Sequence, residues 1–211
     1  MKKLLFAILL SLPIMAVAGG DDAKYLAGAV PQKDGIVVFE KSFSVPGKTK
    51  AQMHDMLKTY LTQLVTQSIP GPTAYARMNM DTPDTIAARC CEWLVFKKKP
   101  LYLDRARMRY QINAFVSPGK ARLQVTQISY YYEEDNEGMG GKVIRAEEWI
   151  TDSEALNKTQ TKLYPRSGKF RRKTIDRVKE IFEGAMDCAE EQAEKQVEQP
   201  VQKKRNHVVE D

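Results

Sequence analysis

Residues 85–134 decide the fold of this chain, and they read TIAARCCEWLVFKKKPLYLDRARMRYQINAFVSPGKARLQVTQISYYYEE. Polar and apolar residues alternate through the middle of this stretch. The even positions are apolar: Ala106, Met108, Tyr110, Ile112, Ala114 and Val116. The odd positions are basic or polar: Arg105, Arg107, Arg109, Gln111 and Asn113. Successive side chains of a strand point to opposite faces, so the segment is predicted to be a half-buried strand with a polar outer face.

The segments on either side of this strand extend it into a sheet. Ser117-Pro118-Gly119-Lys120 predicts a turn, because Pro and Gly are neighbours there. The alternation resumes over 121–134 but slips in phase, which predicts a β-bulge near Thr126-Gln127. Residues 85–97 are apolar on both parities. That pattern is typical of a strand covered on both sides, or of one whose second face lines a ligand pocket or a partner interface.

Before the central stretch, residues 35–45 alternate between polar and apolar and predict a first strand. Thr49-x-x-Gln52 is a capping box, which predicts that a helix begins there. After the central strands, 143–150 predicts a last strand. A second capping box at Thr151 predicts a short helix that Pro165 ends. A longer helix is expected over 169–189. The chain is therefore expected to be a single α+β domain, in the order strand, helix, several antiparallel strands, helix.

Several short stretches carry a resemblance to a known family. They are Gly35–Phe43, Glu92–Phe96, Leu103–Arg105, Ala146–Asp152 and Phe170–Thr174. Together they resemble a family of exported bacterial proteins known only as a domain of unknown function with a fold like the TATA-box-binding protein (TBP-like). The resemblance covers residues 35–189 and implies a curved antiparallel sheet with helices packed on one face. It implies no catalytic residue, cofactor or substrate. It does not imply DNA binding either, because function sits in sites and this chain has one copy of a fold that the TATA-box protein doubles.

Residues 1–18 are predicted to be a secretory signal peptide. Lys2 and Lys3 precede an apolar run that ends in Ala16-Val17-Ala18. The run is broken by Ser11 and Pro13 and is shorter than a membrane span, so cleavage after Ala18 is expected. The protein is then exported to the periplasm or cell surface of a Gram-negative bacterium, with no transmembrane segment after cleavage.

Two further segments are expected to lie outside the folded domain. Residues 19–34 are small and polar and predict a flexible lead-in. Residues 190–211 are dominated by Glu, Gln and Lys, which predicts a charged, disordered tail.

The net charge is +6, and it falls to +4 when Lys2 and Lys3 are removed with the signal peptide (6 − 2). That excess is smaller than nucleic-acid-binding domains carry. Export makes DNA or RNA a poorer expectation still. The expected partner is a protein, a lipid or another component of the cell envelope.

The three cysteines are Cys90, Cys91 and Cys188. Neighbouring strand residues point apart, so Cys188 could form a disulfide with Cys90 or with Cys91 but not with both. The alternative is three buried thiols that pack as small apolar side chains.

Catalytic and metal-binding patterns are weak, and the sequence predicts no catalytic residue, no cofactor and no metal site. The histidines, His54 and His207, have no evident cysteine partner. The cysteines lack zinc-ligand spacing. Four carboxylates could supply an acid and a base, as in glycosidases: Glu92, Asp104, Glu147 and Glu148. Trp93 and Trp149 could stack on sugars, but both also suit a core.

The C-terminal helix has an unusual charge order. Its first half is basic and its second half acidic, the reverse of what the helix dipole favours. Clustered arginines near a helix N-terminus suit an anion. Arg171, Arg172 and Lys173 are therefore candidates to contact a phosphate, a lipid headgroup or an acidic partner. The alternative is a solvated face in which Glu147 and Glu148 pair with the arginines.

These observations favour a non-catalytic binding or interaction domain. An alternative is a carrier that holds a lipid or another apolar ligand between the sheet and the C-terminal helix. A hydrolase is the third hypothesis.

Overall fold

The computed structural model describes residues 22–67, 75–132 and 141–205. The signal peptide expected at 1–18 and its cleavage site lie outside these ranges, as does most of the acidic, glycine-rich stretch between the last two strands.

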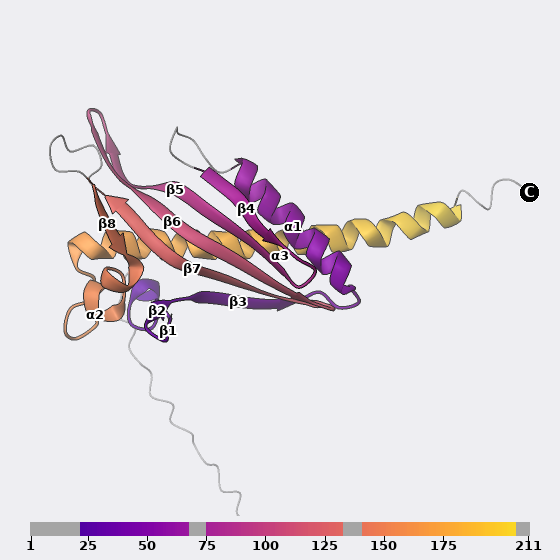
Figure 1. The fold of residues 1–211 in the computed structure, drawn as a ribbon, viewed down its shortest axis with the longest axis horizontal. Coiled ribbons are helices and arrows are strands. Elements are labelled where there is room, and N and C mark those ends of the chain that lie inside the picture. Colours follow the sequence, from indigo (N-terminus) through magenta and orange to yellow (C-terminus); the bar gives the residue numbers. More distant parts are fainter. Residues whose placement is uncertain (1–21, 68–74, 133–140, 206–211) are drawn as a thin grey trace, which may run out of the picture.

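Six antiparallel strands form the main sheet, in the order β3-β7-β6-β5-β4 with β8 pairing to β7 (Figure 1). The strands are β3 (Phe39–Ser44), β4 (Tyr75–Asp81), β5 (Thr85–Lys99), β6 (Tyr102–Ser117), β7 (Lys120–Tyr132) and β8 (Lys142–Arg145). The predicted central stretch is thus the three long strands β5, β6 and β7, which lie side by side.

The phase slip in β7 marks a real irregularity of the sheet. Arg109 pairs with Ser129, but Gln111 pairs with Thr126, and the extra residue Gln127 has a φ of 52°. The predicted bulge is therefore confirmed. A second shift lies between Val95 and Lys97 of β5. The apolar residues on both parities of that strand precede this shift and include Ala87 and Cys91, which are buried on its outer side.

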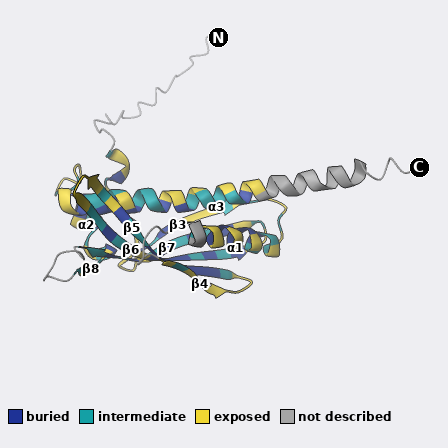
Figure 2. Ribbon diagram, turned by 90° about the horizontal axis from the view of Figure 1, so that it is seen from above, coloured by how far each residue is buried: buried dark blue, intermediate teal, exposed yellow. Residues whose placement is uncertain are grey.

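The two long helices, α1 (Lys50–Gln67) and α3 (Pro165–Arg205), pack against one face of the sheet and against each other (Figure 2). The Tyr60 hydroxyl of α1 donates a 2.7 Å hydrogen bond to the carbonyl of Ile181 in α3. A Cβ at Gly184 would lie 3.0 Å from the Tyr60 ring, so glycine permits this close crossing. In the described ranges, no helix combines the length and the apolar character needed to cross a membrane.

The expected flexible lead-in is integrated into the domain from residue 22 onward. A short helix, η1 (Ala23–Tyr25), is followed by a two-stranded hairpin of β1 (Gln32–Lys33) and β2 (Ile36–Val37). Tyr25 is only 6% exposed, and its hydroxyl donates to Asp176 of α3 at 2.8 Å. The apolar side chains of Tyr25 and Val30 hold this segment against the core, and the sequence pattern did not reveal this role.

The C-terminal part differs from the prediction in two places. After η2 (Ala146–Glu148) the expected short helix is only α2 (Asp152–Ala155), and Pro165 begins α3 instead of ending a helix. Proline is tolerated at the first helical position, where its missing N–H has no partner to lose. The helix then continues to Arg205 through most of the segment that was expected to be disordered, and it projects past the sheet (Figure 1). Glu, Gln, Lys and Ala are strong helix formers, which accounts for the extension.

Candidate functional site

The face of the sheet opposite the helices is strongly basic. On β6, the side chains of Met108, Tyr110 and Ile112 enter the core, so the alternate residues of the strand point away from the helices. Strand register brings the same face of β4, β5 and β7 beside them. We call this surface the arginine face. Its basic side chains are Arg77, Arg89, Arg105, Arg107, Arg109, Lys120 and Arg122.

The centre of the arginine face brings like charges together. Arg89 of β5 lies directly opposite Arg77 of β4, and Arg109 lies on β6 one row away. All three residues are exposed. Like charges opposite one another on neighbouring strands destabilise a sheet, so this arrangement works against stability. On the outward side of β3 to β7, as far as the structure describes them, Glu40 is the one carboxylate, and it accepts hydrogen bonds from Arg122 at 3.1 Å and Gln124 at 2.6 Å.

Aromatic rings lie beneath several of these guanidinium groups. The central carbon of the guanidinium lies over the ring centroid in five pairs. They are Arg105 over Trp93 at 3.8 Å, Arg122 over Phe115 at 4.4 Å, Arg107 over Tyr131 at 4.8 Å, Arg77 over Tyr75 at 5.7 Å and Arg107 over Trp93 at 5.8 Å. Such stacking is favourable and orients the cation. The ring of Trp93, a candidate sugar platform, is therefore covered on one side by Arg105.

Neutral hydrogen-bonding groups lie between the cations. Gln111 is only 6% exposed, and its amide nitrogen donates to the side-chain oxygens of Asn79 at 3.3 Å and Asn113 at 3.2 Å. Its carbonyl oxygen Oε1 is buried and has no hydrogen-bond partner within the described part of the chain. A buried acceptor without a donor is unfavourable, so this position adds to the cost of the arginine face.

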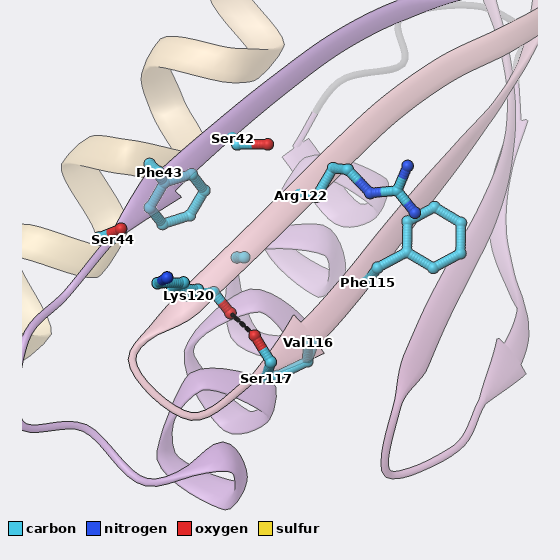
Figure 3. A pocket seen from close by; sticks show the side chains of 9 residues that line it. Ser42, Phe43, Ser44, Phe115, Val116, Ser117, Lys120 and Arg122 are labelled. Atoms are coloured by element: carbon cyan, nitrogen blue, oxygen red, sulfur yellow. Dashed lines mark hydrogen bonds between the residues drawn. The ribbon is translucent and has the colours of Figure 1, made fainter.

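A pocket of about 470 Å³ continues the arginine face toward the β6–β7 turn (Figure 3). Its outward lining combines hydroxyl groups with cations: Ser42, Ser44, Ser117, Lys120 and Arg122. The Ser117 hydroxyl donates to the Lys120 carbonyl at 3.4 Å. The pocket therefore has the same chemistry as the face that leads to it.

Arg171, which the sequence marked as an anion contact, is a structural residue. Its side chain is 0% exposed, and it donates to the carbonyls of Tyr25, Leu26 and Ile150 at 2.6 to 2.7 Å. The anion it meets is internal, because its Nη2 lies 2.6 Å from Asp152 Oδ1. With its N–H groups so engaged, Arg171 is not presented to an external ligand.

Its two neighbours on α3 differ from it and from each other. Arg172 forms a two-pronged pair with Asp22, with both contacts at 2.6 Å, and its hydrogen bond lowers the pKa of that carboxyl. Lys173 is exposed. The alternative pairing with Glu147 and Glu148 is not the one observed, since Glu147 accepts from the Val37 amide and Glu148 pairs with Arg145. An external anion at Arg172 or Lys173 stays a prediction.

Trp149 packs as a core aromatic at the edge of the domain. Its ring meets that of Phe170 edge-on, with the centroids 6.0 Å apart, and Arg166 lies 5.6 Å from its centroid. The ring is half-buried, and its Nε1 is buried without a hydrogen-bond partner among the described residues.

None of the three cysteines forms a disulfide in this structure, so the pairing of Cys188 with Cys90 or Cys91 is not observed. Cys90 faces the core, and burial raises the pKa of its thiol to about 12. Cys91 is buried on the other side of the sheet, opposite Arg109. The Cys188 Sγ lies 3.9 Å from the Met56 carbonyl of α1.

The four candidate carboxylates serve separate structural contacts. Glu92 accepts from Tyr110 and Arg177, both at 2.8 Å, and burial raises the pKa of Tyr110 well above its ordinary value. Asp104 pairs with Lys169 at 2.7 Å. Glu147 accepts from the Val37 amide, and Glu148 pairs with Arg145. In the described ranges no three His, Cys, Asp or Glu side chains gather as metal ligands do.

The sequence contains one feature that points to the arginine face, although no motif marks it. Three arginines share one parity along β6. Alternation alone marks such a strand as half-exposed, whatever the charge on its outer side. The concentration of charge becomes visible only when the register adds the arginines of β4 and β5.

Comparisons with known proteins agree with the architecture. A family profile described as a domain of unknown function (DUF4468) with TBP-like fold matches residues 39–131. The crystal structure of a DUF4468 family protein from Bacteroides ovatus ATCC 8483 is 35% identical, with a TM-score of 0.71, over 81% of this chain and 95% of that chain. No curated protein matches the chain.

A second solved structure, a TBP-like protein from Parabacteroides distasonis ATCC 8503, has a TM-score of 0.60 at 17% identity, over 76% of this chain and 97% of that one. At that identity it supports the fold alone. The curved antiparallel sheet with helices on one face, implied by the resemblance, is thereby confirmed. From its match to the protein of Bacteroides ovatus and to the family profile, the chain belongs to the DUF4468 family of domains with a TBP-like fold.

Proposed function

We propose that the protein is a non-catalytic binding domain whose arginine face binds an acidic polysaccharide. One observation carries the proposal. Seven basic side chains lie on this face, and on the outward side of the described strands β3 to β7 they are accompanied by one carboxylate, Glu40. A surface that concentrates one sign of charge at a cost to stability is complementary to a ligand of the opposite sign.

The stacked guanidinium groups favour oxyanions as the recognised groups. A guanidinium stacked on a ring keeps its N–H groups at the edge of its own plane, and exposed Arg77, stacked on Tyr75, can offer them to a carboxylate or sulfate in pairs. The rings themselves are largely occupied, as Trp93 is by Arg105. That disfavours single-stranded nucleic acids, which are bound through bases stacked on open aromatic rings.

The arrangement of the charges favours a polymer. Arg105, Arg107 and Arg109 alternate along β6, so neighbouring members are about 6.5 Å apart along the strand. Amides and hydroxyls occupy the same face between and beyond the arginines. A sugar acid presents oxyanions and hydroxyls together, and a hydroxyl can also donate to an acceptor such as Gln111 Oε1 once neighbouring exposed side chains move aside.

The export predicted from residues 1–18 supports the same ligand class. An exported domain would meet envelope polysaccharides and would be separated from the chromosome. The separate structural roles of Glu92, Asp104 and Glu148 support binding without hydrolysis.

The carrier hypothesis has less support from the packing. Phe170 of α3 fills the space against the sheet, with its ring centroid 4.5 Å from that of Phe96, 5.1 Å from Tyr130 and 5.2 Å from Tyr132. An apolar groove of about 300 Å³ does lie between β3 and α3, lined by Phe39, Ile175, Val178, Phe182 and Met186 among others. It opens along the edge of the sheet and is not central to it.

The test is binding to acidic and neutral polysaccharides by affinity electrophoresis or calorimetry. Polygalacturonate and heparin are the acidic probes, and dextran is the neutral one. We expect the protein to bind an acidic probe, with affinity that falls as salt screens the charges. Changing Arg77, Arg89 and Arg109 together to Gln should weaken binding at least about tenfold, since charge-assisted hydrogen bonds contribute about 1.5–3 kcal/mol each before screening.

A matched control removes the same charge elsewhere. Lys33, Lys158 and Lys162 are exposed and lie outside the arginine face, and their triple change to Gln should leave binding within about twofold. Equal losses in both triple variants would contradict a specific face. If the protein bound neither polygalacturonate nor heparin, or bound DNA of matched charge clearly more tightly, an acidic polysaccharide would be ruled out as the ligand.

A further inference from the structure

The tip of the β5–β6 hairpin combines exposed apolar side chains with consecutive lysines. Of the nine large apolar side chains exposed in the described ranges, four belong to this hairpin. They are Leu101 at 108% exposed, Tyr102 at 55%, Leu103 at 45% and Val95 at 40%. Single exposed apolar residues are ordinary, but a cluster on one projection marks an interaction site.

The backbone at the tip supports a selected role for Leu101. This residue has a φ of 63°, a region that is strained for a residue with a branched side chain and that glycine or asparagine adopts with ease. Pro100 precedes it, and a turn with Pro followed by a positive φ is where glycine is usual. A strained, fully exposed leucine contributes nothing to the core, so the side chain is expected to act outside the fold.

The hairpin is held firmly at its base and projects beyond it. Phe96 packs on Phe170, and Asp104 pairs with Lys169 of α3 at 2.7 Å. Beyond this anchor, 97–103 is exposed throughout, and the hairpin extends past the neighbouring strands (Figure 1). A projection on a fixed base presents its side chains without ordering a loop when it binds.

The charge on the hairpin selects the kind of partner. Lys97, Lys98 and Lys99 follow one another immediately before the turn. Lysine is depleted from protein–protein interfaces, whereas lysines beside exposed Leu and Tyr are typical of segments that rest in the interfacial layer of a membrane. Lysine also interacts favourably with anionic lipid headgroups.

We propose that this hairpin tip docks the protein onto an anionic lipid bilayer. Leu101 and Leu103 enter the boundary between headgroups and acyl chains, Tyr102 lies at headgroup level, and the three lysines contact lipid phosphates. A narrow convex tip suits a fluid bilayer, which reshapes around it, better than it suits the preformed surface of a protein. This surface is separate from the arginine face and does not depend on the ligand proposed there.

The test is sedimentation of the protein with vesicles of phosphatidylcholine alone, or of phosphatidylcholine and phosphatidylglycerol at about two to one. We expect binding to the anionic vesicles and little binding to the neutral ones. Leu101→Gly should weaken binding about tenfold, because it removes the inserted side chain. It should also keep or raise the melting temperature, since glycine adopts a positive φ readily. Lys97, Lys98 and Lys99 changed together to Gln should reduce binding by a similar factor at low salt.

The arginine-face variant, with Arg77, Arg89 and Arg109 changed to Gln, is the control with equal charge loss, and it should keep most of the vesicle binding. The proposal is overturned if Leu101→Gly binds as wild type does, or if the arginine-face variant loses as much as the lysine variant. Equal binding to both vesicle types, or none to either, also overturns it, and the last result would leave an acidic protein as the partner of the hairpin.

Discussion

Arg171 illustrates how far a single residue can depart from its sequence context. A run of basic residues near the start of a helix is usually solvent-facing. The sequence offers no sign that one member of this run, Arg171, is buried. The acceptors of Arg171 lie in Tyr25 and Leu26, far along the chain, and in Ile150 and Asp152. The buried guanidinium group of Arg171 therefore connects α3 with the N-terminal segment and with the start of α2. The sequence suggested an external anion for this run of residues, but the charged partner of Arg171 is the internal carboxylate of Asp152.

Replacing Arg171 by Met should therefore destabilise the protein by about 3–5 kcal/mol, because it removes the buried cation that donates to Asp152 and to three carbonyls. Denaturant unfolding measures this directly. Arg172→Met is the matched neighbour, and its half-exposed pair with Asp22 should contribute no more than about 1 kcal/mol. Equal losses in the two variants would show that Arg171 does not join the three segments.

The cysteines also depend on their surroundings. Two of the three are buried, and the structure fits the alternative in which all three pack as small apolar groups. The sequence allowed both outcomes because no spacing rule pairs residues across the fold.

Burial raises the pKa of the Cys90 thiol to about 12, so almost no thiolate is present at pH 8. Iodoacetamide at pH 8 should leave Cys90 unmodified in the native protein and should label all three cysteines after unfolding. Peptide mass mapping after each treatment distinguishes the sites. Rapid labelling of Cys90 in the native protein would contradict its burial. Fewer than three labelled cysteines after unfolding without reductant would contradict the absence of a disulfide.

At the scale of elements, regular periodicity predicted the two faces of a strand where the alternation is unbroken, and it was ambiguous where apolar residues occupy both faces. Strand β6 alternates cleanly from Arg105 to Ala114, and the faces of that part follow directly from the sequence. Strand β5 is ambiguous because Ala87 and Cys91 are buried on its outer side. The start of α3 was misplaced because Pro165 reads equally well as the end of one helix or the beginning of the next.

The extension of α3 beyond the sheet should contribute little to stability. Among the residues of α3 whose burial the structure describes, Ala189 is the last buried one, and Glu190 and Glu191 are exposed. Deleting 191–211 should change the melting temperature by less than about 4 °C, which corresponds to about 1 kcal/mol for a domain of this size. Differential scanning calorimetry of the two forms decides it. A larger fall would mean that this segment docks against the domain.

At the scale of the whole molecule, the order of the elements was readable but the candidate site was not. Strand and helix periods predicted one α+β domain and the order of its elements, because the two periods differ clearly along the chain. The placement of the helices on one face of the sheet was implied by the family resemblance. The arginine face depends on register across β4, β5 and β6, and one-residue shifts exchange the two faces of a strand. Register shifts between Met78 and Met80 of β4 and between Val95 and Lys97 of β5 help to set that register, and the sequence pattern did not reveal either of them.

The molecule then presents two different surfaces with different physical properties. The arginine face is broad, charged and rich in amides, whereas the hairpin tip is narrow and apolar with lysines beside it. We expect the first to bind a polymer and the second to approach a bilayer, so the protein would hold an envelope polysaccharide near a membrane.

The central claim is that the arginine face is the binding surface, and nuclear magnetic resonance of the arginine side-chain Nε–H groups tests it most directly. On titration with oligogalacturonate or a heparin fragment, the signals of Arg77, Arg89 and Arg109 should shift progressively, while that of Arg172, paired with Asp22, stays in place. Shifts confined to α3, or an absence of shifts at Arg77, Arg89 and Arg109 while the ligand is bound, would contradict the assignment of this face.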